Sequence, residues 1–454
     1  MTGWKAMMSG LTAELIEEIS ASKKEPTWMR DFRLECLQLY KQAPLPAWMP
    51  DISGLDLDKI VTYVRPGQAQ TTSWEQVPAA IRQTFSELGI PQAEEKFLAG
   101  VSAQYDSELI YHRVQELAAE AGVYYSDLET ALQTDYEPVI RQHFMKLITP
   151  QEHKFAALHG AVWSGGSFVY VPAEVELTLP LQSYFRLNAK GAGQFEHTLI
   201  ILEPKAKLHF IEGCSAPRYN VASLHAGAVE LLVGVGAKLR YSTIENWSKN
   251  MYNLNTKRAQ VAAEGEIEWV SGSFGSAVTC LYPESILAGE RAKSSFLGVT
   301  VAGAGQYLDN GAKVRHQAAG TTSVIRAKSI VKNGGSSVFR SSVTASEQAS
   351  ESKSFVACDS LILDEQSRAD TLPAVVSKTT SFTSAHEARV GRISEETLAF
   401  LQARGLSEEA AVKLVVNGFV DNFARELPLE YAVEMNNLLN LEMQRKPITG
   451  KEKQ

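Results

Sequence analysis

The sequence predicts a mainly β protein in which a central β-solenoid lies between two helical regions. Two observations lead to this prediction. Apolar residues recur at every second position from about residue 155 to Thr380, and at helical spacing before and after this stretch. Within the central stretch, a five-residue unit also recurs several times without helical patterns between its copies.

The first region, residues 1–150, is predicted to be mainly helical. Thr12 can cap a first helix, because a short hydroxyl side chain there can accept a hydrogen bond from the first turn. Prolines then interrupt the chain repeatedly before residue 67, which predicts a connection rich in loops. Helical patterns return over residues 76–147, for example at Glu108–Tyr111.

The second region, residues 151–380, is predicted to form the solenoid. Its recurring unit is a small residue, a charged or polar residue, an aliphatic residue, another charged residue and a ring. Short strands stacked as rungs produce such a loose repeat. An antiparallel sandwich with a coincidental turn composition is the alternative. The copies are Ala206–Phe210, Ala237–Tyr241, Gly265–Trp269 and Ala312–His316, at intervals of 31, 28 and 47 residues.

The third region, residues 381–454, is predicted to be helical. Ser394 and Ser407 are expected to cap two helices, with Gly405 beyond the end of the first. A third helix is expected over Pro428–Met443. Three short amphipathic helices after a β core suit either a docking platform for a partner or a cap over the end of the solenoid.

Composition narrows the functional classes. The chain has 454 residues and a net charge of −8, which argues against a nucleic-acid-binding surface as its main feature. No run of 18 apolar residues occurs, so we expect no membrane span, and the first residues lack the apolar core of a signal peptide. With only four cysteines, the sequence suggests a reducing cytoplasm.

The cysteines are the main candidates for chemistry. No two of them share a CxxC spacing, so any metal or sulfur site must be assembled by the fold. Cys358 ends a strand-like run and is followed by the pair His386 and Glu387, which could complete an iron site. A lone cysteine in a strand is more often a small buried apolar residue. Cys214 lies near a predicted turn, where a thiol can be accessible, although a buried structural cysteine is the favoured alternative there too.

Other residues are more ambiguous. Cys36 and Cys280 are interpreted as structural. The stretch Trp163–Ser167 looks like a phosphate loop but lacks the lysine and hydroxyl residue of such loops, so a tight turn is predicted. Several polar or aromatic residues in strand-like segments would line a hydrophilic path if they face inward and would decorate the surface if they face outward. They are Arg186, Asn188, Glu245, Trp247 and Lys257.

Motifs along nearly the whole chain resemble those of the SufB/SufD family, and of its SufB branch in particular. SufB is the scaffold subunit of the Suf iron–sulfur cluster assembly system. The motifs are long and ordered, which makes the resemblance specific. They are Glu25–Met29, Phe32–Leu34, Trp163–Pro172, Ser183–Asn188, Glu212–Cys214, Asn246–Trp247, Thr256–Ala259, Cys358–Leu361, His386–Ala388, Arg404–Glu409 and Glu426–Pro428.

The resemblance implies a right-handed parallel β-helix core and a scaffold rather than an enzyme. It implies a SufC-type ABC ATPase docked on the C-terminal helices, which agrees with the missing phosphate loop. Further implied partners are a SufD-type paralogue or a second copy of the chain, and a SufE- or SufU-type sulfur donor with a cysteine desulfurase. A reduced flavin is also compatible with the family, although the sequence carries no flavin fingerprint.

The resemblance also implies roles for individual residues. Cys214 would accept sulfur, which would then travel along the five path residues to Cys358. There a transient iron–sulfur cluster would form, with His386 and Glu387 as further metal ligands. One cysteine is too few for a stable cluster, which suits a cluster that is handed on.

Two departures and two rivals accompany this reading. Ala385 stands where some members have Glu, and Glu245 stands where some have Gln. A SufD-like structural subunit that does not hold the cluster is the first rival. A polysaccharide-acting β-helix enzyme is the second, but it predicts secretion and clustered carboxylates on one face, and the sequence has neither feature.

Overall fold

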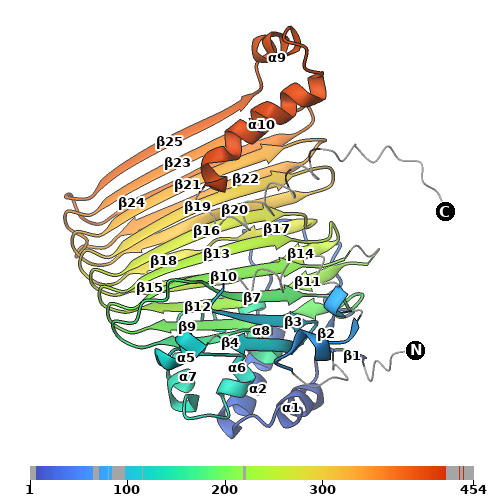
Figure 1. Cartoon of the computed structure of the whole chain (residues 1–454), viewed down its shortest axis with the longest axis vertical. Helices are drawn as coiled ribbons and strands as arrows, with labels where there is room; N and C mark the ends of the chain where they lie inside the picture. The colour runs from blue at the N-terminus through green and yellow to red at the C-terminus, as the bar shows by residue number, and fades with distance from the viewer. Residues whose placement is uncertain are drawn as a thin grey trace, which may run out of the picture.

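The computed structural model describes residues 7–64, 71–79, 81–83, 98–114, 116–217, 221–425, 439 and 443. In these residues the chain winds into a parallel β-solenoid with helices at both ends (Figure 1). The predicted parallel β-helix is therefore confirmed, and the antiparallel sandwich is excluded, because the rungs pair in parallel register.

One wall of the solenoid is a ten-stranded sheet. Only its first strand, β4, runs antiparallel to its neighbour. In spatial order its strands are β4 (Glu108–Val114), β3 (Gly100–Tyr105), β7 (Leu181–Arg186), β10 (Lys207–Ser215), β13 (Lys238–Asn246), β16 (Glu266–Phe274), β19 (Lys293–Ala302), β21 (Thr322–Val331), β23 (Lys353–Ile362) and β25 (Thr383–Arg392).

The second sheet changes along the solenoid axis. In the early turns each rung contributes two short strands: β8 (Gly193–Gln194) and β9 (His197–Leu202), β11 (Ser223–His225) and β12 (Ala228–Val233), β14 (Met251–Asn253) and β15 (Thr256–Val261), then β17 (Val278–Leu281) and β18 (Glu284–Leu287). Both halves then pair with one long strand, β20 (Tyr307–His316), which is followed by β22 (Ser336–Ala345) and β24 (Arg368–Ser377). The short strands β5 (Tyr124–Ser126) and β6 (Phe168–Val171) begin this sheet.

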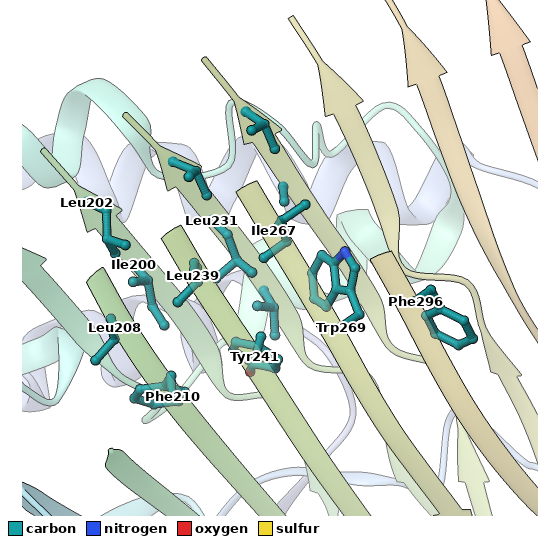
Figure 2. Packing of buried hydrophobic residues seen from close by; sticks show 14 of the residues in the cluster. Ile200, Leu202, Leu208, Phe210, Leu231, Leu239, Tyr241, Ile267, Trp269 and Phe296 are labelled. Carbon is teal, nitrogen blue, oxygen red and sulfur yellow. The ribbon is translucent and has the colours of Figure 1, made fainter. Parts of the chain in front are cut away.

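The recurring unit of the sequence marks the rungs of the first wall. Lys207, Lys238 and Glu266 are register partners in β10, β13 and β16, as expected for stacked copies. The rings of the first two units stack, with the centroids of Phe210 and Tyr241 5.6 Å apart (Figure 2). Tyr241 then meets Trp269 edge to face, and Phe296 is the register partner of Trp269 in the next strand.

The fourth copy of the unit does not belong to this stack. Ala312–His316 lies in β20, in the opposite sheet, whereas the rung after β16 is β19. Both walls present the same alternation of buried and exposed residues, so the pattern of the sequence does not distinguish one wall from the other.

Helices cover the first turns of the solenoid. They are α1 (Ala13–Ser22), α2 (Thr27–Gln42), α5 (Glu116–Glu120), α6 (Leu128–Ala131), α7 (Glu137–His143) and α8 (Lys154–Val162), together with a 3₁₀ turn at Trp74–Gln76. Thr12 caps α1 as predicted, since its hydroxyl accepts from the Leu15 N–H at 3.3 Å. A small separate sheet joins β1 (Met7–Ser9) to β2 (Val61–Val64).

The helical prediction at Glu108–Tyr111 is wrong, because this segment is strand β4. The neighbouring strand β3 pairs in parallel with β7, so the hairpin of β3 and β4 extends the first wall. A short apolar run cannot be assigned to helix or strand from its periodicity alone.

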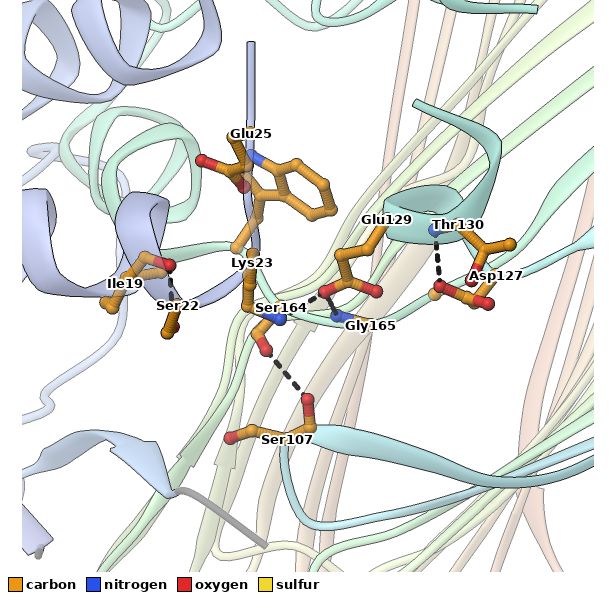
Figure 3. A network of polar contacts seen from close by, with 12 residues as sticks. Ile19, Ser22, Lys23, Glu25, Ser107, Asp127, Glu129, Thr130, Ser164 and Gly165 are labelled. Carbon is orange, nitrogen blue, oxygen red and sulfur yellow. Dashed lines mark hydrogen bonds and ion pairs between the residues drawn. The ribbon is translucent and has the colours of Figure 1, made fainter. Parts of the chain in front are cut away.

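Buried polar contacts tie the N-terminal helices to a turn of the solenoid (Figure 3). The Glu129 carboxylate accepts from Lys23 Nζ at 2.5 Å and from the Gly165 N–H at 2.6 Å. The Ser164 hydroxyl donates to the Ser107 carbonyl at 2.7 Å. Gly165 and Gly166 have φ of 73° and 102°, a conformation that favours glycine, but Trp163–Ser167 is an irregular connection from helix α8 to strand β6 rather than the predicted tight turn.

At the other end, two helices follow the last strand. Ser394 caps α9 (Glu395–Gln402) and Gly405 has φ of 91°, as predicted, and α10 (Glu408–Ala424) then runs along the outside of the first wall (Figure 1). Val416 and Val420 of α10 are buried in the same cluster as Val299 and Ile330 of the wall. The predicted helix over residues 428–443 lies outside the described residues, apart from Leu439 and Met443.

The last rung extends further than the sequence suggested. β25 reaches Arg392, beyond the boundary near residue 380, and its side chains are all exposed. Among the described helices, none is long and apolar enough to cross a membrane.

Candidate functional site

The interior of the solenoid has an apolar half and a polar half. Along β10, Leu208 and Phe210 face the apolar core, and the alternation then brings Glu212 and Cys214 to the same inner face. The register partner of Cys214 in the next rung is Glu245. All of these side chains are buried, so the polar half is a set of charged groups inside the fold.

A buried ion pair forms the centre of the polar half. Lys257, which enters from β15 in the opposite sheet, donates to Glu212 Oε1 at 2.9 Å and to Thr243 Oγ1 at 3.2 Å. Glu245 Oε1 lies 3.8 Å from the same ammonium. The Tyr241 hydroxyl donates to the second oxygen of Glu212 at 2.5 Å. Lys257 thus neutralises part of the charge of two buried carboxylates.

A second chain of contacts leads from Glu245 towards Cys214. Asn253 Nδ2 donates to Glu245 Oε2 at 2.7 Å, and Asn253 Oδ1 lies 2.9 Å from His225 Nδ1. His225 Nε2 forms a short contact with Glu196. One ligand atom each of Glu196, Cys214 and His225 lie within 4.8 Å of one another. Four strands, β10, β11, β13 and β14, and the corner between β8 and β9 thus bring these groups together.

These surroundings change the protonation of the site. Burial and the neighbouring carboxylates, first among them Glu212, raise the pKa of Cys214 well above its ordinary value. Burial likewise raises the pKa of Glu245. Burial alone would lower the pKa of His225, but Glu196 reverses this and raises it. Cys214 is therefore held as a thiol until a proton acceptor or a cation approaches.

The remaining predicted path residues lie around this network. The Trp247 ring is 4.5 Å from the His225 ring, and Trp247 packs in one buried cluster with Cys214. Arg186 is half-buried at the end of β7 and donates to Ser215 Oγ at 2.8 Å. The backbone N–H of Asn188 donates to Asp106 Oδ1 at 2.5 Å. Arg186 and Asn188 thus lie at the rim beside Cys214 rather than inside the ion-pair network.

Cys358 lies five strand-to-strand steps away, in β23. At about 4.8 Å a step, the two thiol-bearing strands are roughly 24 Å apart. Cys358 is fully buried in the apolar core, and its Sγ lies 3.5 Å from the Thr371 hydroxyl of β24. Burial raises the pKa of Cys358.

The pair that follows Cys358 is split between two faces. In β25, His386 is the register partner of Val356 and Ala388 is the partner of Cys358, so His386 lies on the inner face. Glu387 lies on the outer face and forms a short ion pair with Arg389. Both side chains are exposed, because no further described strand covers β25.

Small and hydroxyl residues occupy the inner positions between the two thiols. They form two columns, each made of register partners in successive strands. A cavity between the walls is lined by members of both columns, including Ser271, Gly298, Thr300 and Ala327. The Cys358 column is Glu212, Thr243, Ser271, Gly298, Ala327 and Cys358, and the Cys214 column is Cys214, Glu245, Ser273, Thr300, Ser329 and Ser360.

The other two cysteines lie outside the interior. Cys36 packs among the N-terminal helices, and Cys280 faces the same helical cluster. Burial raises the pKa of each to about 12. Neither thiol lies in the two inner columns that hold Cys214 and Cys358, which agrees with the structural interpretation.

Sequence reasoning missed four members of the site: Glu196, Glu212, His225 and Asn253. Glu212 could have been found, because it lies two residues before Cys214 and must share its face. The others come from corners and short strands of the second sheet. The sequence contains no local pattern that predicts their proximity to Cys214.

The structure thus combines a parallel β-solenoid with two distant buried thiols and a buried ion network. Comparison with known proteins gives the family. The profile described as "SUF system FeS cluster assembly, SufBD core domain" matches residues 185–419. The chain belongs to the SufBD family.

Curated relatives agree along almost the full length. An iron-sulfur cluster assembly SufBD family protein of Staphylococcus epidermidis is 48% identical over 435 residues, which cover 96% of this chain and 93% of the relative. Two proteins of the same description from strains of Staphylococcus aureus are 48% and 47% identical over the same shares.

Proposed function

We propose that this chain is an assembly scaffold for iron–sulfur clusters, with Cys214 as sulfur acceptor and Cys358 as the site of a transient cluster. Iron and sulfide are its cargo, and it is not an enzyme in the sense of turnover. The observation that carries the proposal is the continuous polar and small-residue interior between the two thiols.

The first step is transfer of sulfur to Cys214. The Cys214 thiolate attacks the outer sulfur of a donor persulfide, forming a Cys214 persulfide and releasing the donor thiolate. The thiol proton passes to the Glu196 carboxylate, which has an oxygen within 4.8 Å of the Cys214 sulfur, and Lys257 offsets negative charge nearby. A SufE- or SufU-type protein, loaded by a cysteine desulfurase, is the proposed donor.

The second step must bridge roughly 24 Å, because the two thiols lie five strand steps apart. None of the described residues along the two columns is another cysteine. A dithiol reductant releases the sulfur from the Cys214 persulfide. The dithiol is oxidised to a disulfide, Cys214 returns to a thiol, and the outer sulfur leaves as hydrogen sulfide. Buried polar atoms without protein partners in the described part of the chain, such as Thr279 Oγ1 and Asn310 Oδ1, support a hydrated interior that could conduct it.

The third step is cluster formation beside Cys358. His386 is the better placed additional ligand, because it shares the inner face of the last rung, whereas Glu387 points to the other face. Glu387 could act as a ligand only from the outer side or through its neighbours. A cluster with so few protein ligands here needs others from a partner.

The partners follow from the exposed end. Val375 and Val390 lie on inner positions of β24 and β25, yet they are 44% and 49% exposed. Such apolar exposure supports a SufD-type paralogue or a second copy of the chain as the cover. We further propose that the C-terminal helices dock a SufC-type ABC ATPase, and that assembly takes place in the cytoplasm.

The proposal leaves flavin out, because no feature among the described residues supports a flavin site. A SufD-like structural role predicts the same fold but no cluster on Cys358. Anaerobic reconstitution of the purified chain with iron and sulfide separates the two functions. The scaffold function predicts a visible sulfide-to-iron chromophore in the wild type that Cys358→Ala lacks and the control Cys280→Ala keeps. Equal chromophores in all three proteins would refute it.

A further inference from the structure

Three side chains near the sulfur-accepting end have the composition of a metal site. Glu196, Cys214 and His225 each offer a ligand atom, and these atoms lie within 4.8 Å of one another. In a tetrahedral zinc site, bonds of about 2.0–2.3 Å keep ligand atoms roughly 3.5 Å apart. Small side-chain movements are therefore enough to close the three groups around one ion.

Hydrogen bonds orient the His225 imidazole so that one ring nitrogen faces the other two candidate ligands. A carboxylate can only accept, so Glu245 requires Asn253 to present its NH₂ group, at 2.7 Å. The amide oxygen of Asn253 then faces His225 Nδ1 at 2.9 Å and accepts a hydrogen bond from its N–H. This leaves Nε2 directed towards Glu196 and Cys214. An outer hydrogen bond of this kind fixes the tautomer of metal-binding histidines in general.

The charge of the interior favours a cation. Three buried carboxylates, Glu196, Glu212 and Glu245, lie in one network, and the described cations beside them are Lys257 and, when protonated, His225. Buried charges are costly unless they are paired. A divalent ion would offset the excess and the additional charge of a Cys214 thiolate.

Unsatisfied atoms point to the same place. Glu196 Oε2 and the indole Nε1 of Trp247 have no hydrogen-bond partner in the described parts of the chain, although both atoms are buried. Glu196 is 2% exposed, and Trp247 packs against His225. Buried polar atoms nearly always have partners in native proteins, so a bound group at this position would satisfy the carboxylate.

We infer that Glu196, Cys214 and His225 bind one thiophilic divalent transition-metal ion, of the class of Zn²⁺ or Fe²⁺, at the sulfur-accepting end of the solenoid. Thiolate, imidazole and carboxylate together match this class of ion rather than Mg²⁺ or Ca²⁺. Glu245 and Asn253 are positioning residues. Metal binding and sulfur acceptance use the same sulfur atom, so they exclude each other.

Cobalt titration of the purified, reduced full chain under anaerobic conditions tests the site. Co²⁺ bound by a thiolate gives a charge-transfer absorption that Zn²⁺ abolishes by competition. We expect one Co²⁺ per chain, with the band lost in Cys214→Ser and affinity lowered at least tenfold in His225→Gln and Glu196→Gln. Glu245→Gln should weaken binding about 10- to 100-fold by freeing the Asn253 amide, without changing the band of the saturated protein.

The cysteine variants separate this inference from the scaffold function. Cys280→Ser is the matched control with an equally buried thiol and should bind Co²⁺ normally. Cys358→Ser should also keep the band, even though it should lose the reconstituted cluster. A band that depends on Cys358 and not on Cys214, or no band in the wild type, would overturn the metal site.

A second measurement on the wild type covers the case in which a variant does not fold. Zn²⁺ should slow alkylation of Cys214 by iodoacetamide, followed residue by residue by mass spectrometry, while the rate at Cys280 stays the same. Equal rates at Cys214 with and without Zn²⁺ would contradict the inference. If His225 instead has only a redox or acid–base role, the protein should show no cobalt band, and Zn²⁺ should not protect Cys214 from alkylation.

Discussion

Cys214 and Cys358 share one solenoid interior but differ in almost everything around them. Cys214 lies in an enclosed rung beside charged groups from both walls, whereas Cys358 lies among apolar and hydroxyl side chains one strand from the end. The first environment is complete within the chain. In the second, the described residues leave β24 and β25 exposed, so the comparison sets an enclosed site against an open one.

The largest expected difference is in local opening. Strand β13 is paired on both sides, whereas among the described strands β25 pairs only with β23, and its side chains are exposed throughout. In the isolated chain, hydrogen exchange of β25 amides should be at least about a thousandfold faster than that of β13 amides, since edge elements open at low free energy. Mass spectrometry of peptic fragments measures both. Similar protection would mean that the last rung is as stable as the enclosed one.

The stability of the enclosed rung should depend strongly on the buried Lys257. Lys257→Met removes the cation that pairs with Glu212 and lies near Glu245, so two carboxylates stay buried without it. We expect the free energy of unfolding to fall by about 3–5 kcal/mol in urea titrations. The exposed pair of Lys205 and Glu174 provides the control, because Lys205→Met should leave stability almost unchanged. Comparable stability of the two variants would show that the buried network is not held by its cation.

The last rung, formed by β24 and β25, should tolerate charged substitutions in the isolated chain but not in a complex with a partner. Val375→Asp with Val390→Asp should leave the fold intact but weaken association with a paralogue or second copy roughly 100-fold, because each aspartate would be buried unpaired. Sedimentation analysis measures the association. Val235→Asp, on an exposed turn of an early rung, is the matched control and should associate normally. Unchanged association of the double variant would place the interface elsewhere.

The same comparison explains what could be predicted from sequence. The repeats that begin at Ala206, Ala237 and Gly265 are consecutive rungs, because one wall repeats its chemistry at each turn. The copy that begins at Ala312 was wrongly grouped with these rungs, because the second wall has the same alternation of buried and exposed residues. The segment Glu108–Tyr111, predicted to be helical, forms a strand because its pairing with β3 decides the structure of this short apolar run.

The site divides in the same way. Glu212 follows from the alternation around Cys214, whereas His225 and Asn253 approach it only because short strands of the second sheet close the turn. That His386 and Glu387 face opposite sides follows from their being neighbours in one strand. Which of the two faces Cys358 depends on the register of β25, which the sequence alone does not contain.

The smallest expected effect separates these two neighbours. His386→Ala removes an inner-face imidazole beside Cys358, so we expect several-fold faster loss of a reconstituted cluster, followed by its visible absorption during chelation. Glu387→Ala removes a carboxylate that faces outward and pairs with Arg389, so it should change the rate little in the isolated chain. Because the two residues are adjacent and equally exposed, general disturbance of β25 would affect both alike. A larger effect of Glu387→Ala would mean that the cluster forms on the outer face of the last rung, and that Cys358 reaches it only after β23 and β25 rearrange.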